Sequence, residues 1–254
     1  MIIGKIIYAT ISSKEKVEKH QQIIRDSEWA QIENHIAKKS KLLDVGCGAG
    51  YSLMRATQDL DCKAVGIDPD PGAHGVGRFV EDLVNNVPIK QGFAEDLPFA
   101  DDSFDVVYSS HVLEHVNDEV KALDEMRRVL KKNGVLIIGM PTSNMAILNY
   151  ISQILFTTHI KIYELLRNLF SENPIKNLIK IFRINSHSYP RANSIWYDII
   201  HYRIKAWKKT ISKRFEIIKV IKPCLYPYPD YPQLFKLHKN NFFSSSVFFI
   251  CSKK

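Results

Sequence analysis

The residues best suited to chemistry lie in one short stretch, residues 42–50, which reads Leu-Leu-Asp-Val-Gly-Cys-Gly-Ala-Gly. An apolar run leads into glycines at three alternate positions, and residues 51–60 then have a composition compatible with a helix. A strand, a glycine turn and a helix form the nucleotide-binding unit of a doubly wound sheet, in which ligands lie at the carboxyl ends of the strands. Gly46, Gly48 and Gly50 lack a Cβ, so the chain can turn sharply and a ligand can lie against it.

Two acidic residues indicate what kind of ligand this is. Asp44 stands just before the glycines, where its carboxylate would attract an ammonium group and repel a pyrophosphate. Asp68-Pro69 ends a second predicted strand, residues 64–67, about 20 residues beyond the glycines, the place from which an acidic side chain reaches both hydroxyls of a ribose. The spacing therefore favours a ligand that carries an ammonium group and a ribose.

A second group of polar residues follows a predicted fourth strand, residues 104–110. The sequence predicts a helix over residues 111–130, which would place His111, Glu114 and His115 on one helix face. A histidine with a pKa near 6.5 suits a general base. Glu114 and His115 could instead bind a metal ion or only hold the helix in place, and we predict no metal ligand.

These residues need a sheet and helices to position them. The sequence predicts a leading helix over 14–39, a helix over 194–212, and further strands at 41–46, 88–92, 135–140, 215–220 and 242–251, the last of them antiparallel. An apolar stripe at helical spacing after residue 141 predicts a helical cap. The expected organisation is a core over 1–141, a cap over 142–193 and the end of the core over 194–254.

Composition and charge limit the class of protein. A chain of 254 residues can form one α/β domain with an elaboration. The four cysteines show no paired spacing, which fits a reduced compartment, and no apolar run reaches the length of a membrane span, so we expect a cytoplasmic location. Residues 1–141 carry a net charge of −5 and residues 142–254 a net charge of +13. The asymmetry favours an anionic partner, with peripheral membrane contact through 145–183, unless it reflects only a coding bias toward lysine and isoleucine.

In their order and spacing, these motifs resemble the class I S-adenosylmethionine-dependent methyltransferases, in particular the small-molecule branch that includes quinone-biosynthesis enzymes. The likeness covers residues 41–141 in four segments: LLDVGCGAG, VGIDPD, GFAEDLPFADDSFDVVYSSHVLEHV and RRVLKKNGVLIIGMP. It implies an α/β fold with a doubly wound, seven-stranded, mostly parallel sheet, and a helical cap inserted after the fifth strand. It also implies S-adenosylmethionine as the cofactor.

The resemblance assigns roles to individual residues. Asp44 would hold the methionine ammonium group, Asp68 would bind the ribose hydroxyls, and Ser110 would line the methionine and the methyl group. The full cofactor-binding set is Asp44, Gly46, Gly48, Gly50, Asp68, Pro69, Phe93, Ala94, Glu95 and Ser110. Phe93 stands where many family members have an aspartate. Either Glu95 binds the adenine amino group, or Phe93 packs on the adenine ring, or Phe93 is a plain core aromatic residue.

The catalytic candidates are His111 and His187, the second at the point where the cap rejoins the core. Quinone O-methyltransferases carry a metal-binding Glu-x-x-Glu-His run here, and His111 in place of its first acid weakens such a site. The expected acceptor is a small molecule, with a hydroxyl on a lipid-linked, phosphorylated or quinone-type precursor favoured. Nucleic acid is disfavoured as a partner, and no oligomeric state is indicated. RNA methylation and a non-catalytic regulatory or scaffold role are the alternatives.

Overall fold

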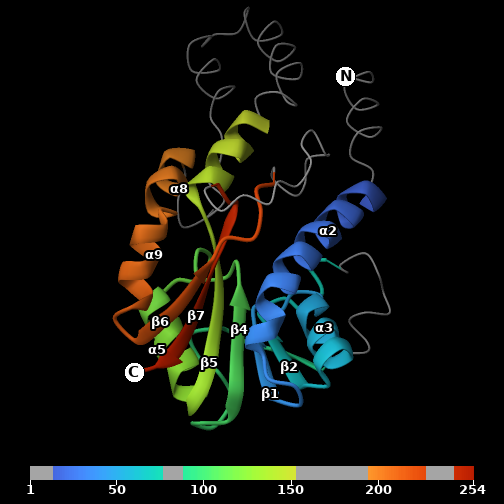
Figure 1. The fold of residues 1–254 in the computed structure, drawn as a ribbon, viewed down its shortest axis with the longest axis vertical. Coiled ribbons are helices and arrows are strands. Elements are labelled where there is room, and N and C mark those ends of the chain that lie inside the picture. Colours follow the sequence, from blue (N-terminus) through green and yellow to red (C-terminus); the bar gives the residue numbers. More distant parts are fainter. Residues whose placement is uncertain (1–13, 77–87, 153–193, 227–242) are drawn as a thin grey trace, which may run out of the picture.

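The computed structural model describes residues 14–76, 88–152, 194–226 and 243–254 (Figure 1). Its centre is one seven-stranded sheet with the strand order β3-β2-β1-β4-β5-β7-β6. The strands are β1 (Lys41–Val45), β2 (Lys63–Asp68), β3 (Ile89–Gln91), β4 (Phe104–Ser110), β5 (Leu130–Pro141), β6 (Phe215–Ile221) and β7 (Ser246–Lys253). Only β7 runs antiparallel to its neighbours, which confirms the expected mostly parallel sheet.

Helices lie on both faces of this sheet. They are α2 (Lys14–Ile32), followed by the short 3-10 helix η1 (Glu33–His35), then α3 (Tyr51–Leu60), α5 (Glu119–Val129), α8 (Ile195–His201) and α9 (Ile204–Ile211). Residues 143–152 are also helical. The leading helix, α3 and all seven strands therefore lie where the sequence predicts them, within a few residues.

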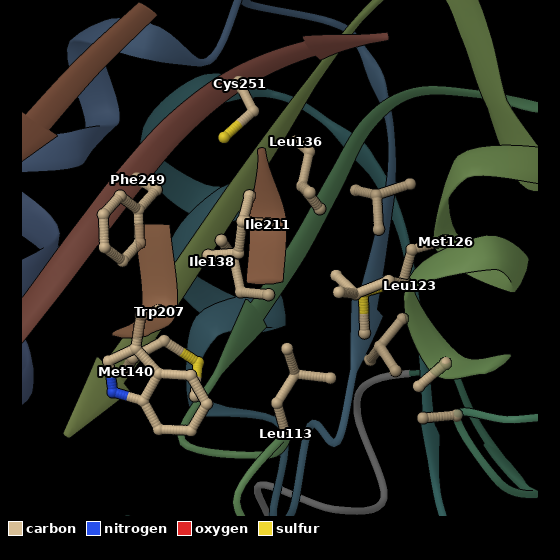
Figure 2. Close-up of a cluster of buried hydrophobic side chains, with 14 of the residues drawn as sticks. Leu113, Leu123, Met126, Leu136, Ile138, Met140, Trp207, Ile211, Phe249 and Cys251 are labelled. Atoms are coloured by element: carbon tan, nitrogen blue, oxygen red, sulfur yellow. The ribbon is translucent and has the colours of Figure 1, made fainter. Parts of the chain in front are cut away.

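The two faces of the sheet have separate apolar layers. Four of the five residues of β1 are buried, which is typical of a parallel strand covered on both sides. One layer packs α5 and α9 against the central strands, and Figure 2 shows its side chains converging: Leu113, Leu123, Met126, Leu136, Ile138, Met140, Trp207, Ile211, Phe249 and Cys251. The other layer packs α2 and α3 on the opposite face, through Trp29, Ile32, Leu53, Ala56, Leu42, Val106 and Tyr108 among others.

The sheet has its topological switch point at β1. This strand pairs with β2 on one side and with β4 on the other, so the chain leaves β1 toward β2 and leaves β4 in the opposite direction, toward β5. Ligands of doubly wound sheets bind in the crevice that forms there. The glycine stretch follows β1 and His111 follows β4, so the fold brings both groups of candidate residues to one edge.

The prediction of a helix beginning at His111 was wrong. Residues 111–118 form turns, and α5 begins only at Glu119. Asp118 is its N-cap, with a side chain that accepts hydrogen bonds from the N–H groups of Val120 and Lys121. An aspartate in this position ends the non-helical segment because it satisfies N–H groups that lack helical partners.

The predicted helix over 194–212 is divided in two. The carbonyl of Tyr202 accepts a hydrogen bond from the N–H of Ser143, and Arg203 has an extended backbone before α9 begins. The carbonyl of Tyr202 therefore bonds to the segment that follows β5 and not to a later residue of a continuous helix, and the helix is interrupted at this point.

Several expectations fall outside the described residues. These include most of the cap, with its residues 153–193, and the candidate His187. Among the helices that the structure does describe, none combines the length and the apolar character needed to cross a membrane.

Candidate active site at the carboxyl edge of β1 and β4

The glycine stretch after β1 is a tight turn in which side chains would not fit. Gly46, Gly48 and Gly50 have φ values of +74°, +54° and +86°, a region that residues with a Cβ rarely adopt. A Cβ on Gly46 would lie 2.2 Å from Val112 Cγ2, and one on Gly48 would lie 2.5 Å from the carbonyl oxygen of His74. Glycine is required here by both backbone conformation and close packing, which leaves an open backbone cradle for a ligand.

Asp68 ends β2 beside this turn, as the sequence predicts. Its Oδ2 accepts a hydrogen bond from the N–H of Gly48 at 2.8 Å, and its Oδ1 accepts one from the N–H of Asp70 at 2.9 Å. A carboxylate has about four lone-pair sites. Each oxygen therefore retains acceptor capacity for a hydroxyl, and the arrangement fits the two hydroxyls of a ribose.

Asp44 is almost completely buried, with 2% of its surface exposed. Its Oδ2 has no hydrogen-bond partner within the described chain. Burial, and then the nearby negative charge of Asp68, raises its pKa to about 8. A bound cation would offset this burial and stabilise the charged carboxylate, so Asp44 fits the ammonium group that S-adenosylmethionine carries.

The loop after β3 presents an exposed aromatic ring. Phe93 is 62% exposed, which contradicts the interpretation as a core residue, while Ala94 beside it is buried. The Glu95 carboxylate accepts hydrogen bonds from the N–H groups of Asn117 and Asp118 at 2.9 and 3.4 Å. Glu95 therefore fastens the turn before α5, and Phe93 is the member of this loop with a surface to offer an adenine ring. Pro69 is also exposed.

The end of β4 holds Ser110 and His111. The Ser110 Oγ has no hydrogen-bond partner in the described part of the chain. His111 adopts the left-handed region at φ +58°, and its N–H donates to the carbonyl of Gly139. This bond to β5 holds the backbone of His111 in its left-handed conformation.

Two carboxylates lie near the His111 ring. Nδ1 is 3.5 Å from Glu114 Oε1, and Nε2 is 4.0 Å from Glu28 Oε1. Burial, and then the positive charge of Arg25, lowers the pKa of His111 to about 3. The imidazole is therefore neutral at neutral pH, and Nε2, which lacks a hydrogen-bond partner among the described residues, can accept a proton.

His111, Glu114 and His115 do not share a helix face, because they lie in turns. They are still close together, since the His115 Nε2 is 4.0 Å from the same Glu114 Oε1. No group of three or more His, Cys, Asp or Glu side chains within the described ranges has the geometry of a metal site.

A buried charged network on the leading helix has no counterpart among the sequence predictions. Glu28 is 1% exposed, and its Oε2 accepts a hydrogen bond from Arg25 at 2.5 Å. Its Oε1 accepts hydrogen bonds from the hydroxyl groups of Tyr226 at 3.2 Å and Ser246 at 2.5 Å. Burial alone would raise the pKa of Glu28, but Arg25 and these donors outweigh it and lower the pKa. The signal was available, since Arg25 and Glu28 stand one turn apart within the stripe of Ile24, Trp29 and Ile32.

Comparisons with known proteins bear on this geometry. The methyltransferase domain model matches residues 43–138, the part that contains the glycine turn, Asp68 and His111. Over 105 residues, the chain is 35% identical to ajmaline N-methyltransferase of Rauvolfia serpentina, a match that covers 40% of this chain and 36% of that protein. Over 100 residues, it is 35% identical to an uncharacterised methyltransferase of Bacillus subtilis, with 39% of each covered. The matched region is thus less than half the length of these relatives.

Solved structures resemble a larger part of the chain. A protein of Thermotoga maritima, described as an S-adenosylmethionine-dependent methyltransferase and possible histamine N-methyltransferase, has a TM-score of 0.57 at 22% identity, with 95% of this chain and 94% of that chain covered. A Listeria monocytogenes protein described as a putative S-adenosylmethionine-dependent methyltransferase has a TM-score of 0.54 at 15% identity, with 90% and 97% covered. At these identities the likeness is one of fold. Together with the domain match over residues 43–138, it shows that this part of the chain is a methyltransferase domain.

Proposed function

We propose that this protein transfers a methyl group from S-adenosylmethionine to a small-molecule acceptor held at the carboxyl edge of β1 and β4. The observation that carries the proposal is the group of buried polar atoms without hydrogen-bond partners among the described residues at this edge. They are Asp44 Oδ2, Ser110 Oγ and His111 Nε2. Buried polar groups are normally hydrogen-bonded, so such a group at a switch point indicates a ligand that supplies the missing partners.

The cofactor, when bound, supplies an electrophilic methyl group on a sulfonium. The chain's own residues would bind and orient it: Asp44 through the ammonium group, Asp68 through the ribose and Phe93 through the adenine ring. Ser110 ends β4 and stands next to His111 in the chain, and it would line the methionine and the methyl group. His111 would accept a hydrogen bond from the acceptor and take its proton through Nε2, with Glu114 orienting the ring through Nδ1.

The low basicity of His111 favours a neutral hydroxyl as the acceptor group. A hydroxyl oxygen becomes strongly acidic as its new bond to carbon forms, so even a weak base can take the proton at that moment. An alkylammonium group would have to lose its proton beforehand, which demands a stronger base. This supports the expected hydroxyl acceptor.

A nitrogen acceptor is the second candidate. Two of the similar proteins are described as N-methyltransferases, one from Rauvolfia serpentina and one, as a possibility, from Thermotoga maritima. A weakly basic aromatic amine, neutral at pH 7, would fit His111 as well as a hydroxyl does.

Calorimetry with S-adenosylmethionine is the first test, and the expected result is saturable binding. The absence of heat at millimolar cofactor would refute the proposal. Transfer of a labelled methyl group to panels of phenols, alcohols and aromatic amines then separates the two acceptor classes. Binding without transfer to any panel would favour a regulatory protein over an enzyme.

The basic half of the chain supports a lipid-linked or phosphorylated acceptor and contact with an anionic membrane. Residues 142–254 carry a net charge of +13, and Ile147 and Ile151 at the start of the predicted cap are 41% exposed. Co-sedimentation with vesicles that contain anionic lipid tests this contact, and equal sedimentation with neutral vesicles would contradict a role for charge.

A further inference from the structure

The charged pair Arg25 and Glu28 lies on the part of α2 that faces the active site. Trp29 packs edge-on against Tyr108, with ring centroids 6.2 Å apart. Tyr108 is the register partner of Asp44 on the neighbouring strand. Asp44 also points to the face that α2 covers, since side chains alternate along a strand and Leu42 belongs to the same apolar layer as Trp29. The helix therefore lies directly over Asp44.

The direction of α2 carries Arg25 toward the ligand edge. The helix ends near the start of β1, so its earlier residues lie toward the carboxyl ends of the strands, as Figure 1 shows for α2 and β4. Arg25 is one turn before Trp29 on the same face, a step of about 6 Å along the axis.

Electrostatic effects agree with this placement. Burial and the charge of Asp68 raise the pKa of Asp44, and the positive charge of Arg25 opposes that rise; at His111, burial lowers the pKa and Arg25 lowers it further. The guanidinium group thus lies within charge-interaction range of both the ammonium site and the acceptor site.

Glu28 holds Arg25 in this position. It binds one guanidinium nitrogen, while Tyr226, which follows β6, and Ser246, the first residue of β7, donate hydrogen bonds to its other oxygen. A guanidinium has five N–H donors, and 28% of the Arg25 side chain remains exposed. Arg25 therefore has a fixed orientation and donors to spare, which is the condition for binding a planar carboxylate.

We propose that Arg25 binds the methionine carboxylate of S-adenosylmethionine, so that Arg25 and Asp44 together recognise the zwitterionic amino-acid end of the cofactor, with Glu28 as the positioning residue. The proposal rests on the proposed function, because it takes this cofactor as the ligand. It assigns to the leading helix the selection of the intact cofactor over its decarboxylated form. A carboxylate or phosphate on the acceptor is the other source of an anion for Arg25, and the experiment separates the two.

The test is calorimetry of the full chain with S-adenosylmethionine and with decarboxylated S-adenosylmethionine, which keeps the sulfonium, ribose, adenine and amino group. A charge-assisted hydrogen bond corresponds to about a 10- to 150-fold preference of the wild-type protein for the intact cofactor. Arg25→Ala should lower affinity for the intact cofactor by that factor and leave affinity for the decarboxylated form nearly unchanged. Arg55→Ala is the matched control, since this arginine on α3 pairs with Asp26 and Asp59, and both affinities should be retained.

Arg25→Ala leaves the buried Glu28 without its cation, so Arg25→Ala/Glu28→Gln is the second variant, checked for folding by circular dichroism. It should show the same loss of preference. Equal affinity of the wild-type protein for both cofactors, or an unchanged preference in a folded variant, would overturn the inference while leaving the proposed function intact. Loss of methyl transfer with the preference unchanged would assign Arg25 to the acceptor and would also overturn it. Failure of the wild-type protein to bind either cofactor would refute the proposed function itself.

Discussion

The two halves of the active site are built in different ways. In the cofactor half, Asp68 binds the N–H of Gly48 only 20 residues before it in the chain, and the turn is defined by backbone conformation. In the half that the leading helix completes, Ser246 binds Glu28 across 218 residues, and this contact joins two side chains. The first half follows from a contiguous motif, whereas the second exists only when the leading helix and the last strand meet. The first should therefore respond to local backbone changes, and the second to the loss of single buried charges.

The largest expected effect tests the long-range half. Glu28→Ala removes the acceptor for Arg25, Tyr226 and Ser246 and leaves these partly or fully buried donors unpaired, which should lower the free energy of unfolding by about 3–5 kcal/mol. Denaturant titration measures it. Glu216→Ala, at an exposed position on β6, is the control and should change stability by no more than about 0.5 kcal/mol. Equal losses in the two variants would contradict the role of the network.

The next prediction tests the local half. Gly48→Ala places a Cβ 2.5 Å from the carbonyl oxygen of His74 and forces a positive φ on alanine. The αL conformation costs about 1–2 kcal/mol by itself, and the collision adds to it and moves the turn, so cofactor affinity should fall at least tenfold. Gly75→Ala has a similar φ with open space around its Cβ, so it should show the backbone cost alone and keep cofactor binding. Loss of cofactor binding in both variants would show that backbone strain, and not the collision in the glycine turn, causes the loss of affinity.

For Asp44, we expect one substitution to raise the stability of the protein and to weaken its binding of the cofactor. Its pKa is raised to about 8 in the folded protein, so its contribution to stability is present at low pH and is lost as pH rises toward 8. Asp44→Asn should raise the free energy of unfolding at pH 8 by about 1–3 kcal/mol, a gain that disappears near pH 4. The same variant should bind S-adenosylmethionine about 10- to 150-fold more weakly. A variant that is stabilised without weaker binding would remove Asp44 from the ammonium site.

The smallest expected effect concerns His111. Its pKa is lowered to about 3, below the unfolded value, so it costs stability as pH falls from 7 to 5 because only the unfolded chain takes up the proton. His111→Gln should reduce this decline by about 1 kcal/mol. Thermal unfolding of both proteins at pH 7, 6 and 5 measures it, and parallel curves would show that His111 titrates normally.

Much of the sheet and the cofactor motif could be predicted from local patterns. Strand β4 and helix α3 have the predicted bounds, because apolar periodicity and the glycine turn mark them. The start of α5 was misplaced because apolar spacing continues through residues 111–118. There Asp118 caps the helix, and Glu95, from the preceding loop, binds the N–H groups before it. The contact from Glu95 joins two loops that are about 20 residues apart in the chain. The residue pattern of the helix therefore could not reveal it.

The sequence by itself determined the glycine turn and the two acids that suit an ammonium group and a ribose, since each depends on residues near one another in the chain. Only the tertiary structure decided that His111 has a left-handed backbone and lies between Glu114 and Glu28. It also decided that Arg25 belongs to the site. These placements depend on how α2 packs over β1 and β4, and buried charges there are tolerated only because partners distant in sequence meet them.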